Sequence, residues 1–251
     1  MGVLELWHFQ DPSISKSIPY PKAKYAFPRL ADGFEYWYIT MSANPTTGYI
    51  PCTELLSPTK PMYYPCPDER IHAFCVYLLK SNQPDGVARP YVFFVNIHTF
   101  LHPSQPILEF MATSTNADDP IPWEIWGHNT RWFSENISTE WQHSLYGCRT
   151  VEIVDPPSPD TTTIPAAPRY LRVRDFNPYA LAYAEEDRDG WRGRIVREPS
   201  TILAEDAFDQ DVVSHLPYCE IVSEEAFNVT DVMMDDGRIL LLKVSLFAAC
   251  P

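Results

Sequence analysis

The chain has 251 residues and a formal net charge of −14, and 45% of its residues are hydrophobic. This apolar fraction is large enough for a packed core, which argues against intrinsic disorder. The 25 prolines exclude a helical bundle and favour many short elements, because proline cannot continue a helix or donate a hydrogen bond in a central strand.

The negative charge is concentrated between residues 200 and 237, a stretch with ten acidic residues and no Lys or Arg. Such a surface repels phosphate, so we expect neither nucleic acid nor an anionic membrane as a partner. The stretch has two interpretations: a solvated acidic face, or a face that binds a basic protein partner. The candidate residues for such binding are Glu205, Asp206, Asp209, Asp211, Glu224 and Glu225.

In chain order, the pattern predicts a strand over residues 3–9 and a turn at Ala31-Asp32-Gly33. The aromatic stretch 36–41 is typical of a buried strand. A proline-rich irregular loop is expected over 42–69. It is followed by a hairpin of 70–79 and 91–97, whose strands are apolar on both faces, as in stacked sheets.

The second half of the chain continues with short elements. We expect a helical turn at 98–102, a strand at 107–111 and a second proline-rich loop at 155–168. A helix capped by Asn177 is expected over 178–184, and a final hairpin over 228–234 and 238–244. The strand at 170–176 should point Arg172 and Arg174 outward. The other predicted elements are strands at 131–133 and 148–154 and a helical turn at 138–144.

Residues 123–154 hold four of the seven tryptophans. Each buried ring removes about 150–250 Å² from water, so this stretch is predicted to anchor the core. The structural anchor candidates are Trp123, Trp126, Arg131, Trp132, Trp141 and Arg149. The alternative is that the tryptophans line a groove for a sugar or a peptide.

The sequence contains no motif that is typical of a particular enzymatic reaction. Nucleophile elbows and phosphate-binding glycine loops are absent, and no cysteine–histidine spacing matches a standard zinc site, so we expect no catalytic, metal or cofactor site. The six cysteines are too sparse for a disulfide scaffold. The start of the chain has no secretion signal, and no run is long enough to span a membrane, so we expect an intracellular protein.

Asp-Gly pairs recur at 32–33, 85–86, 189–190 and 236–237. Their spacings fit a repeat of about 50 residues, which is typical of propeller blades. Four hairpin turns spaced by chance would give the same pattern. No motif longer than the Asp-Gly pair recurs at this spacing.

Several phrases resemble the C-terminal region of F-box proteins from mushroom-forming fungi, and together they extend over nearly the whole chain. They are FPRL at 27–30, PDERIH at 67–72, TRWF at 130–133, STEWQH at 138–143, YG at 146–147, RDFNPY at 174–179 and DVMMDD at 231–236.

The resemblance implies a propeller-like β domain that presents a substrate protein to a cullin-type ubiquitin ligase. The sequence contains no F-box segment, so binding of the ligase adaptor would require an F-box outside this chain. We therefore expect one mainly β domain over 1–251: a partial WD-repeat-like or kelch-like array of small antiparallel sheets with a few short helices. The expected function is non-enzymatic protein interaction. The alternative is a carbohydrate-binding module or glycoside-active enzyme that uses tryptophan and acidic residues.

Overall fold

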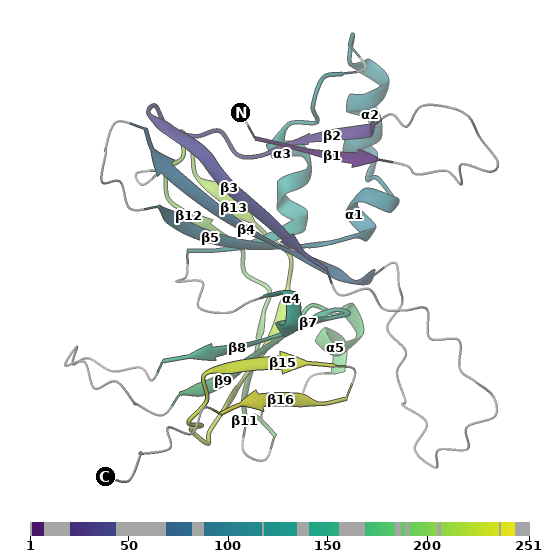
Figure 1. Ribbon diagram of the computed structural model, residues 1–251. Coiled ribbons are helices and arrows are strands. Elements are labelled where there is room, and N and C mark those ends of the chain that lie inside the picture. Colours follow the sequence, from purple (N-terminus) through teal and green to yellow (C-terminus); the bar gives the residue numbers. More distant parts are fainter. Residues whose placement is uncertain are drawn as a thin grey trace, which may run out of the picture. The chain divides into compact units, whose positions relative to one another are not determined.

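A computed structural model of the chain confirms the mainly β class, with several small antiparallel sheets and few helices (Figure 1). It forms two compact units. Unit 1 comprises residues 1–41, 74–136 and 198–216, and unit 2 comprises residues 42–73, 137–197 and 217–251. The structure describes residues 2–7, 21–43, 69–81, 88–116, 118–134, 141–155, 169–183, 187–188, 191–204, 207–235 and 237–243.

Unit 1 is built on a four-stranded sheet with the order β3-β4-β5-β6. The hairpins β1–β2 and β12–β13 and three short helices complete it. Its strands are β1 (Val3–Trp7), β2 (Pro21–Ala26), β3 (Phe34–Ser42), β4 (Ile71–Lys80, in unit 1 from residue 74), β5 (Arg89–Asn96), β6 (Thr130–Phe133), β12 (Ser200–Ile202) and β13 (Val212–Ser214). Its helices are α1 (His98–Leu101), α2 (Gln105–Thr113) and α3 (Trp123–Trp126), followed by the 3-10 turn η2 (Gly127–Asn129).

Stacked aromatic rings form the centre of the unit 1 core. Phe93 on β5 lies between Phe74 on β4 and Trp132 on β6, with ring centroids 4.7 and 4.6 Å away. Trp123 meets Trp132 edge to face at 5.6 Å. Aromatic pairs in these geometries add about 0.5–1.5 kcal/mol beyond the area that they bury. The apolar pattern of β4 and β5 is therefore explained by this packing.

Unit 2 is built on a six-stranded antiparallel sheet with the order β10-β11-β14-β9-β8-β7. Its strands are β7 (Leu145–Tyr146), β8 (Arg149–Val154), β9 (Tyr170–Asp175), β10 (Asp187–Arg188), β11 (Trp191–Val196) and β14 (Tyr218–Ser223), with the separate hairpin β15 (Asp231–Met234) and β16 (Ile239–Leu242). Its helices are α4 (Trp141–Ser144) and α5 (Pro178–Tyr183). Leu171 and Val173 on β9 pack in a core cluster with Val232 and Met234 on β15.

Most predicted elements are present with small shifts of their ends. Both hairpins form, as β4–β5 and β15–β16, and the helical turn at 98–102 is α1. The predicted cap of α5 is confirmed, because the Asn177 side-chain oxygen accepts the Tyr179 N–H at 2.9 Å. The predicted turn before β3 is also confirmed: Gly33 has φ 83°, and the Phe34 N–H donates to the Ala31 carbonyl.

The strand predicted at 107–111 is wrong, because these residues lie in helix α2. Pro106 occupies the first turn of α2, where its missing N–H and fixed φ favour a helix, and Ser104 precedes the helix in extended conformation. Ile107 is buried, and Phe110, three residues later, also packs against the core. This spacing places both side chains on one helix face.

The predicted burial of 36–41 is also wrong. These residues form strand β3, but Trp37, Tyr38 and Met41 expose 60%, 55% and 57% of their surface. β3 is the outer strand of its sheet among the described residues, so it lacks a neighbour that would cover them. An aromatic, β-branched sequence favours a strand but does not determine whether it lies at the edge.

The propeller-like arrangement stays a prediction. β1 pairs with β2, and β16 pairs with β15, so these two end strands do not pair with each other in the described sheets. No closed barrel is seen among the described strands. The two proline-rich loops at 42–69 and 155–168 lie largely outside the described residues, as do the Asp-Gly pairs at 85–86 and 189–190.

Candidate functional site: the acidic surface of unit 1

The four tryptophans of the 123–154 stretch are all buried, with 0–5% of their surface exposed. Trp123, Trp126 and Trp132 belong to unit 1 and Trp141 to unit 2. The Trp126 indole N–H donates to the Ala26 carbonyl at 2.9 Å. Trp126, Trp132 and Trp141 therefore offer no exposed ring on which a sugar could stack, and Trp123, 5% exposed, lines the hollow described below.

The two arginines of the same stretch have different settings. Arg131 is 3% exposed and donates through Nη1 to the Glu198 carbonyl at 2.7 Å. Arg149 lies at the start of β8, half-buried, in register with Asp175 on β9. The first is in unit 1 and the second in unit 2.

The chain fold distributes the predicted acidic candidates over both units. Asp209 and Asp211 are exposed in unit 1, and Glu224 and Glu225 are exposed in unit 2. Glu224 forms an ion pair with Arg192 at 3.1 Å, which neutralises part of its charge. Glu205 and Asp206 lie outside the described residues.

Asp211 lines a hollow of about 690 Å³ in unit 1, which we call the Trp123 hollow. One wall comes from α3 and η2 and the other from β13 and the residues beside it. The lining residues are Trp123, Glu124, His128, Gln210, Asp211, Val213 and His215. Residues of the tryptophan stretch and of the acidic stretch, which were considered separately in the sequence, therefore line the same hollow.

Hydrogen bonds hold the two carboxylates of the Trp123 hollow. Glu124 Oε1 accepts the Gln210 amide at 2.6 Å, and Asp211 Oδ1 accepts the Ala204 N–H at 2.9 Å. No described Lys or Arg forms an ion pair with either carboxylate. The wall is closely packed at Gly127, where an added Cβ would clash with the Trp123 ring.

A second hollow of about 540 Å³ lies at the start of β3, and we call it the β3 hollow. It is lined by Pro28, Arg29, Leu30, Ala31, Asp32, Gly33, Phe34, Glu35, Tyr36 and Asp209. The lining includes three carboxylates, those of Asp32, Glu35 and Asp209, and one guanidinium, that of Arg29. All four side chains are exposed, and no described partner forms an ion pair with the carboxylates.

Backbone hydrogen bonds fix the wall of the β3 hollow. The Asp209 N–H donates to the Arg29 carbonyl at 3.1 Å, and the Ala31 N–H donates to the Ala207 carbonyl at 3.0 Å. Tyr36 donates its hydroxyl to the Pro28 carbonyl at 2.6 Å. Burial, together with the negative charge of Asp209, raises the pKa of Tyr36, so its hydroxyl stays protonated and keeps this hydrogen bond.

The turn 209–211 separates the two hollows: Asp209 lines the β3 hollow, and Gln210 and Asp211 line the Trp123 hollow. We call the two hollows and this turn the acidic surface of unit 1. Its five carboxylates are those of Asp32, Glu35, Glu124, Asp209 and Asp211. The arrangement suits a ligand with more than one positive charge, because cationic groups can pair with carboxylates in either hollow.

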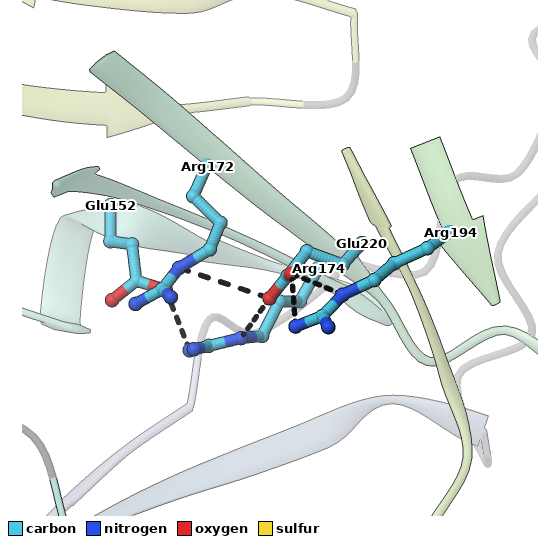
Figure 2. Close-up of polar contacts among 5 residues, drawn as sticks. All are labelled: Glu152, Arg172, Arg174, Arg194 and Glu220. Atoms are coloured by element: carbon cyan, nitrogen blue, oxygen red, sulfur yellow. Dashed lines mark hydrogen bonds and ion pairs between the residues drawn. The ribbon is translucent and has the colours of Figure 1, made fainter. Parts of the chain in front are cut away.

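Unit 2 carries a different charged cluster, the arginine–glutamate lattice of β8, β9, β14 and β11 (Figure 2). Arg174 contacts Glu152 at 2.6 Å and Glu220 at 3.4 Å. Arg172 also reaches Glu152, at 2.7 Å, and Arg194 reaches Glu220, at 2.7 Å. In this lattice each glutamate has at least two arginine partners, and Glu220 joins three strands.

Two of the expectations drawn from the sequence, for Arg174 and for Glu220, are wrong. Arg174 is 1% exposed and not outward-facing, because the face of β9 that carries it is buried with its glutamate partners. Glu220, one of the ten acidic residues of 200–237, is 5% exposed and is neutralised by arginines from other strands. Sequence reasoning missed the lattice because its pairs join residues 20–46 positions apart. The only local signal was the alternation of arginines in β9.

The described residues contain no group of three or more His, Cys, Asp or Glu side chains arranged to hold a metal ion. No helix in the described part of the chain is long and apolar enough to cross a membrane. The chain matches no known protein family, no curated protein and no solved structure.

Proposed function

We propose that the chain is a non-enzymatic protein-interaction domain whose acidic surface in unit 1 binds a basic segment of a partner protein. Its role would be similar to that of the substrate-recognition part of an F-box protein, the family that the sequence phrases resemble. Attachment to a cullin-ligase adaptor would then require an F-box outside this chain.

The observation that carries the proposal is the grouping of five exposed carboxylates around two hollows in one unit. Carboxylates at a surface are normally hydrated or balanced by nearby Lys and Arg. Arg29 is the one Lys or Arg among the lining residues; His128 and His215 also line the Trp123 hollow, and Lys80 and Arg89 lie over the Phe34 ring beside the β3 hollow. A partner with Lys or Arg side chains would complete the charge balance, and its approach would be accelerated by the net charge of −14.

Affinity capture with a charge-neutralised variant tests this function. The variant combines Glu124→Gln, Asp209→Asn and Asp211→Asn, which keep side-chain size and remove three charges. These residues are exposed, so we expect the variant to fold. A partner captured by the natural chain should be lost, with binding weakened at least about tenfold, because charge-assisted contacts contribute roughly 1.5–3 kcal/mol each.

The matched control neutralises Glu224, Glu225 and Asp231 in unit 2 and should capture the same partner. The proposal is wrong if capture is unchanged by the unit 1 substitutions. It is also wrong if the chain captures no protein while the purified chain converts a small molecule, as an enzyme would.

A further inference from the structure

The Trp123 hollow contains a buried hydrogen-bond donor without an acceptor. Trp123 is 5% exposed and lines the hollow, and its indole N–H donates to no acceptor in the described part of the chain. The Trp126 N–H, by contrast, donates to the Ala26 carbonyl at 2.9 Å. The Trp132 indole nitrogen is fully enclosed, whereas that of Trp123 is not, so the Trp123 N–H is open to a ligand in the hollow. Because a buried tryptophan usually donates its N–H, this donor points to an acceptor on a ligand.

Close packing fixes the direction of this donor. The Trp123 ring meets the Trp126 ring edge to face at 4.8 Å and the Trp132 ring edge to face at 5.6 Å. An added Cβ at Gly127 would clash with the Trp123 ring, so the backbone of η2 also lies against it. A donor that is already held in one orientation loses little conformational entropy when a ligand binds.

Each of the two carboxylates that line the hollow keeps one oxygen for a ligand. Glu124 Oε1 accepts the Gln210 amide at 2.6 Å, and Asp211 Oδ1 accepts the Ala204 N–H at 2.9 Å. The second oxygens, Glu124 Oε2 and Asp211 Oδ2, accept no hydrogen bond from a described residue. Glu124 lies on α3 and Asp211 directly before β13, so the two available oxygens come from the two walls.

The lining of the hollow carries excess negative charge. It contains two carboxylates and no Lys or Arg, so its charge is −2 when His128 and His215 are counted as neutral, as in the formal charge at pH 7. Lys80 and Arg89 lie over the ring of Phe34, which is not a lining residue of this hollow. A cationic ligand with several N–H donors therefore matches the lining.

We propose that the Trp123 hollow binds one arginine residue of a basic partner segment, with its guanidinium between Glu124 and Asp211 and a backbone carbonyl of the segment on the Trp123 N–H. This inference rests on the proposed function and names the residue type that the hollow selects. The guanidinium has five N–H donors in a planar fork, which can bond carboxylates on both walls at once, whereas the lysine ammonium is a compact point charge.

Nuclear magnetic resonance of the full chain with isotope-labelled tryptophans tests this site. The probes are capped pentapeptides of glycine and serine with a central arginine, lysine or citrulline, at about pH 7.5, where an ordinary imidazole is neutral. The arginine peptide should shift the Trp123 indole signal, identified by sequential assignment, and leave that of Trp126 in place, because the Trp126 N–H already has an acceptor.

The other two peptides test the choice of arginine. Citrulline keeps the shape of the side chain without its charge and should bind at least about tenfold more weakly, because the charge-assisted hydrogen bonds are lost. Lysine should bind at least about fivefold more weakly, because its single ammonium cannot bond both walls in the same way. A Trp123 signal that does not move at about 5 mM arginine peptide, or lysine binding as tight as arginine binding, overturns the inference.

Two double variants locate the site. Glu124→Gln with Asp211→Asn should weaken the arginine peptide at least about tenfold. The matched control, Asp32→Asn with Glu35→Gln, removes the same charge from the β3 hollow of the same unit and should leave the affinity within about twofold, because surface charges beyond contact distance are screened by salt. Equal weakening by both variants overturns the inference, since the net charge alone would then attract the peptide.

The two proposals fail in distinguishable ways. Capture of a partner that depends on Glu124, Asp209 and Asp211, combined with a Trp123 signal that arginine peptides do not move, would leave the proposed function in place and reject the arginine site. Binding of the arginine peptide in the hollow, combined with capture that those substitutions do not change, would reject the proposed function.

Discussion

Arg174 shows how a charge can be accommodated inside unit 2. Its side chain is 1% exposed, and its guanidinium lies between Glu152 and Glu220, each 7% exposed at the side chain. Burying a charge is costly unless it is paired and hydrogen-bonded, so the three side chains depend on one another. Arg172 and Arg194 add contacts to the same carboxylates and connect the lattice to solvent.

Replacing Arg174 with Met is expected to reduce the free energy of unfolding by about 3 kcal/mol, since two buried carboxylates would each lose a partner. The exposed pair of Arg192 and Glu224 is the control: Arg192→Ala should cost less than about 1 kcal/mol. Urea denaturation followed by circular dichroism measures both. Equal losses in the two variants would show that the lattice does not depend on Arg174.

His72, in the part of β4 that belongs to unit 2, gives the fold a pH dependence. Burial, with the positive charge of Arg70, lowers the pKa of His72 from 6.5 to about 4, and its Nδ1 has no hydrogen-bond partner in the described part of the chain. The unfolded chain therefore binds a proton at higher pH than the folded chain. The stability contributed by neutral His72 is complete above pH 6.5 and is lost as pH falls toward 4.

This loss should amount to about 3 kcal/mol between pH 6.5 and 4. The His72→Gln variant should show a correspondingly flatter dependence of its free energy of unfolding on pH. His143→Gln, at an exposed histidine of the same unit, should retain the natural slope. If the His72→Gln variant and the natural chain lost the same free energy of unfolding over this pH range, protonation of a group other than His72 would cause the loss.

At the scale of single elements, the turn before β3 positions both the strand and its hollow. Gly33 has φ 83°, a conformation that costs other residues roughly 1–2 kcal/mol. Its carbonyl accepts the Ser81 N–H at 2.8 Å, which joins the start of β3 to the end of β4. The Asp-Gly pair at 32–33 therefore marks the turn that leads into β3.

Gly33→Ala is expected to lower the free energy of unfolding by about 1 kcal/mol or more. Gly237→Ala, in the turn between β15 and β16, should change it by less than about 0.5 kcal/mol, since an added Cβ there meets no atom within 4 Å and the backbone has no positive φ. Thermal unfolding of both variants measures the difference. A Gly237→Ala loss as large as that of Gly33→Ala would contradict this explanation.

Strands and turns of this chain could be predicted where the signal was local. The apolar runs of β4 and β5, the Asp-Gly turn at Gly33 and the Asn177 cap all depend on residues close in sequence. Helix α2 was missed because a short apolar run fits a strand as well as a helix. β2 was not predicted because its two lysines and its first residue, a proline, do not resemble a typical strand sequence. It forms a strand by pairing with β1.

The candidate site was predictable only in its parts. The sequence placed Asp209 and Asp211 in an acidic stretch and predicted that Trp123 anchors the core. Their meeting in one hollow depends on residues 198–216 folding into unit 1 while residues 217–251 fold into unit 2. The sequence contains no local signal for that division, and the exposed edge of β3 depends in the same way on which strand becomes its neighbour.

At the scale of the whole molecule, two units with separate cores carry different charged features. The five carboxylates around the hollows of unit 1 form no ion pair with a described Lys or Arg, whereas the carboxylates of the lattice in unit 2 are paired with arginines. Excess charge at a surface attracts a partner, and paired charge inside a sheet stabilises a fold only if each group is satisfied. The proposed recognition function therefore belongs to unit 1, and the lattice of unit 2 stabilises its sheet.

Site-specific photocross-linking in an extract of the source organism tests the central claim most directly. A photoactivatable residue would replace Glu35 or Gln210 in the acidic surface, or Leu240 on β16 as the control. We expect one discrete protein adduct shared by positions 35 and 210 and absent from position 240. An adduct at position 240 alone, or none at positions 35 and 210, would contradict it.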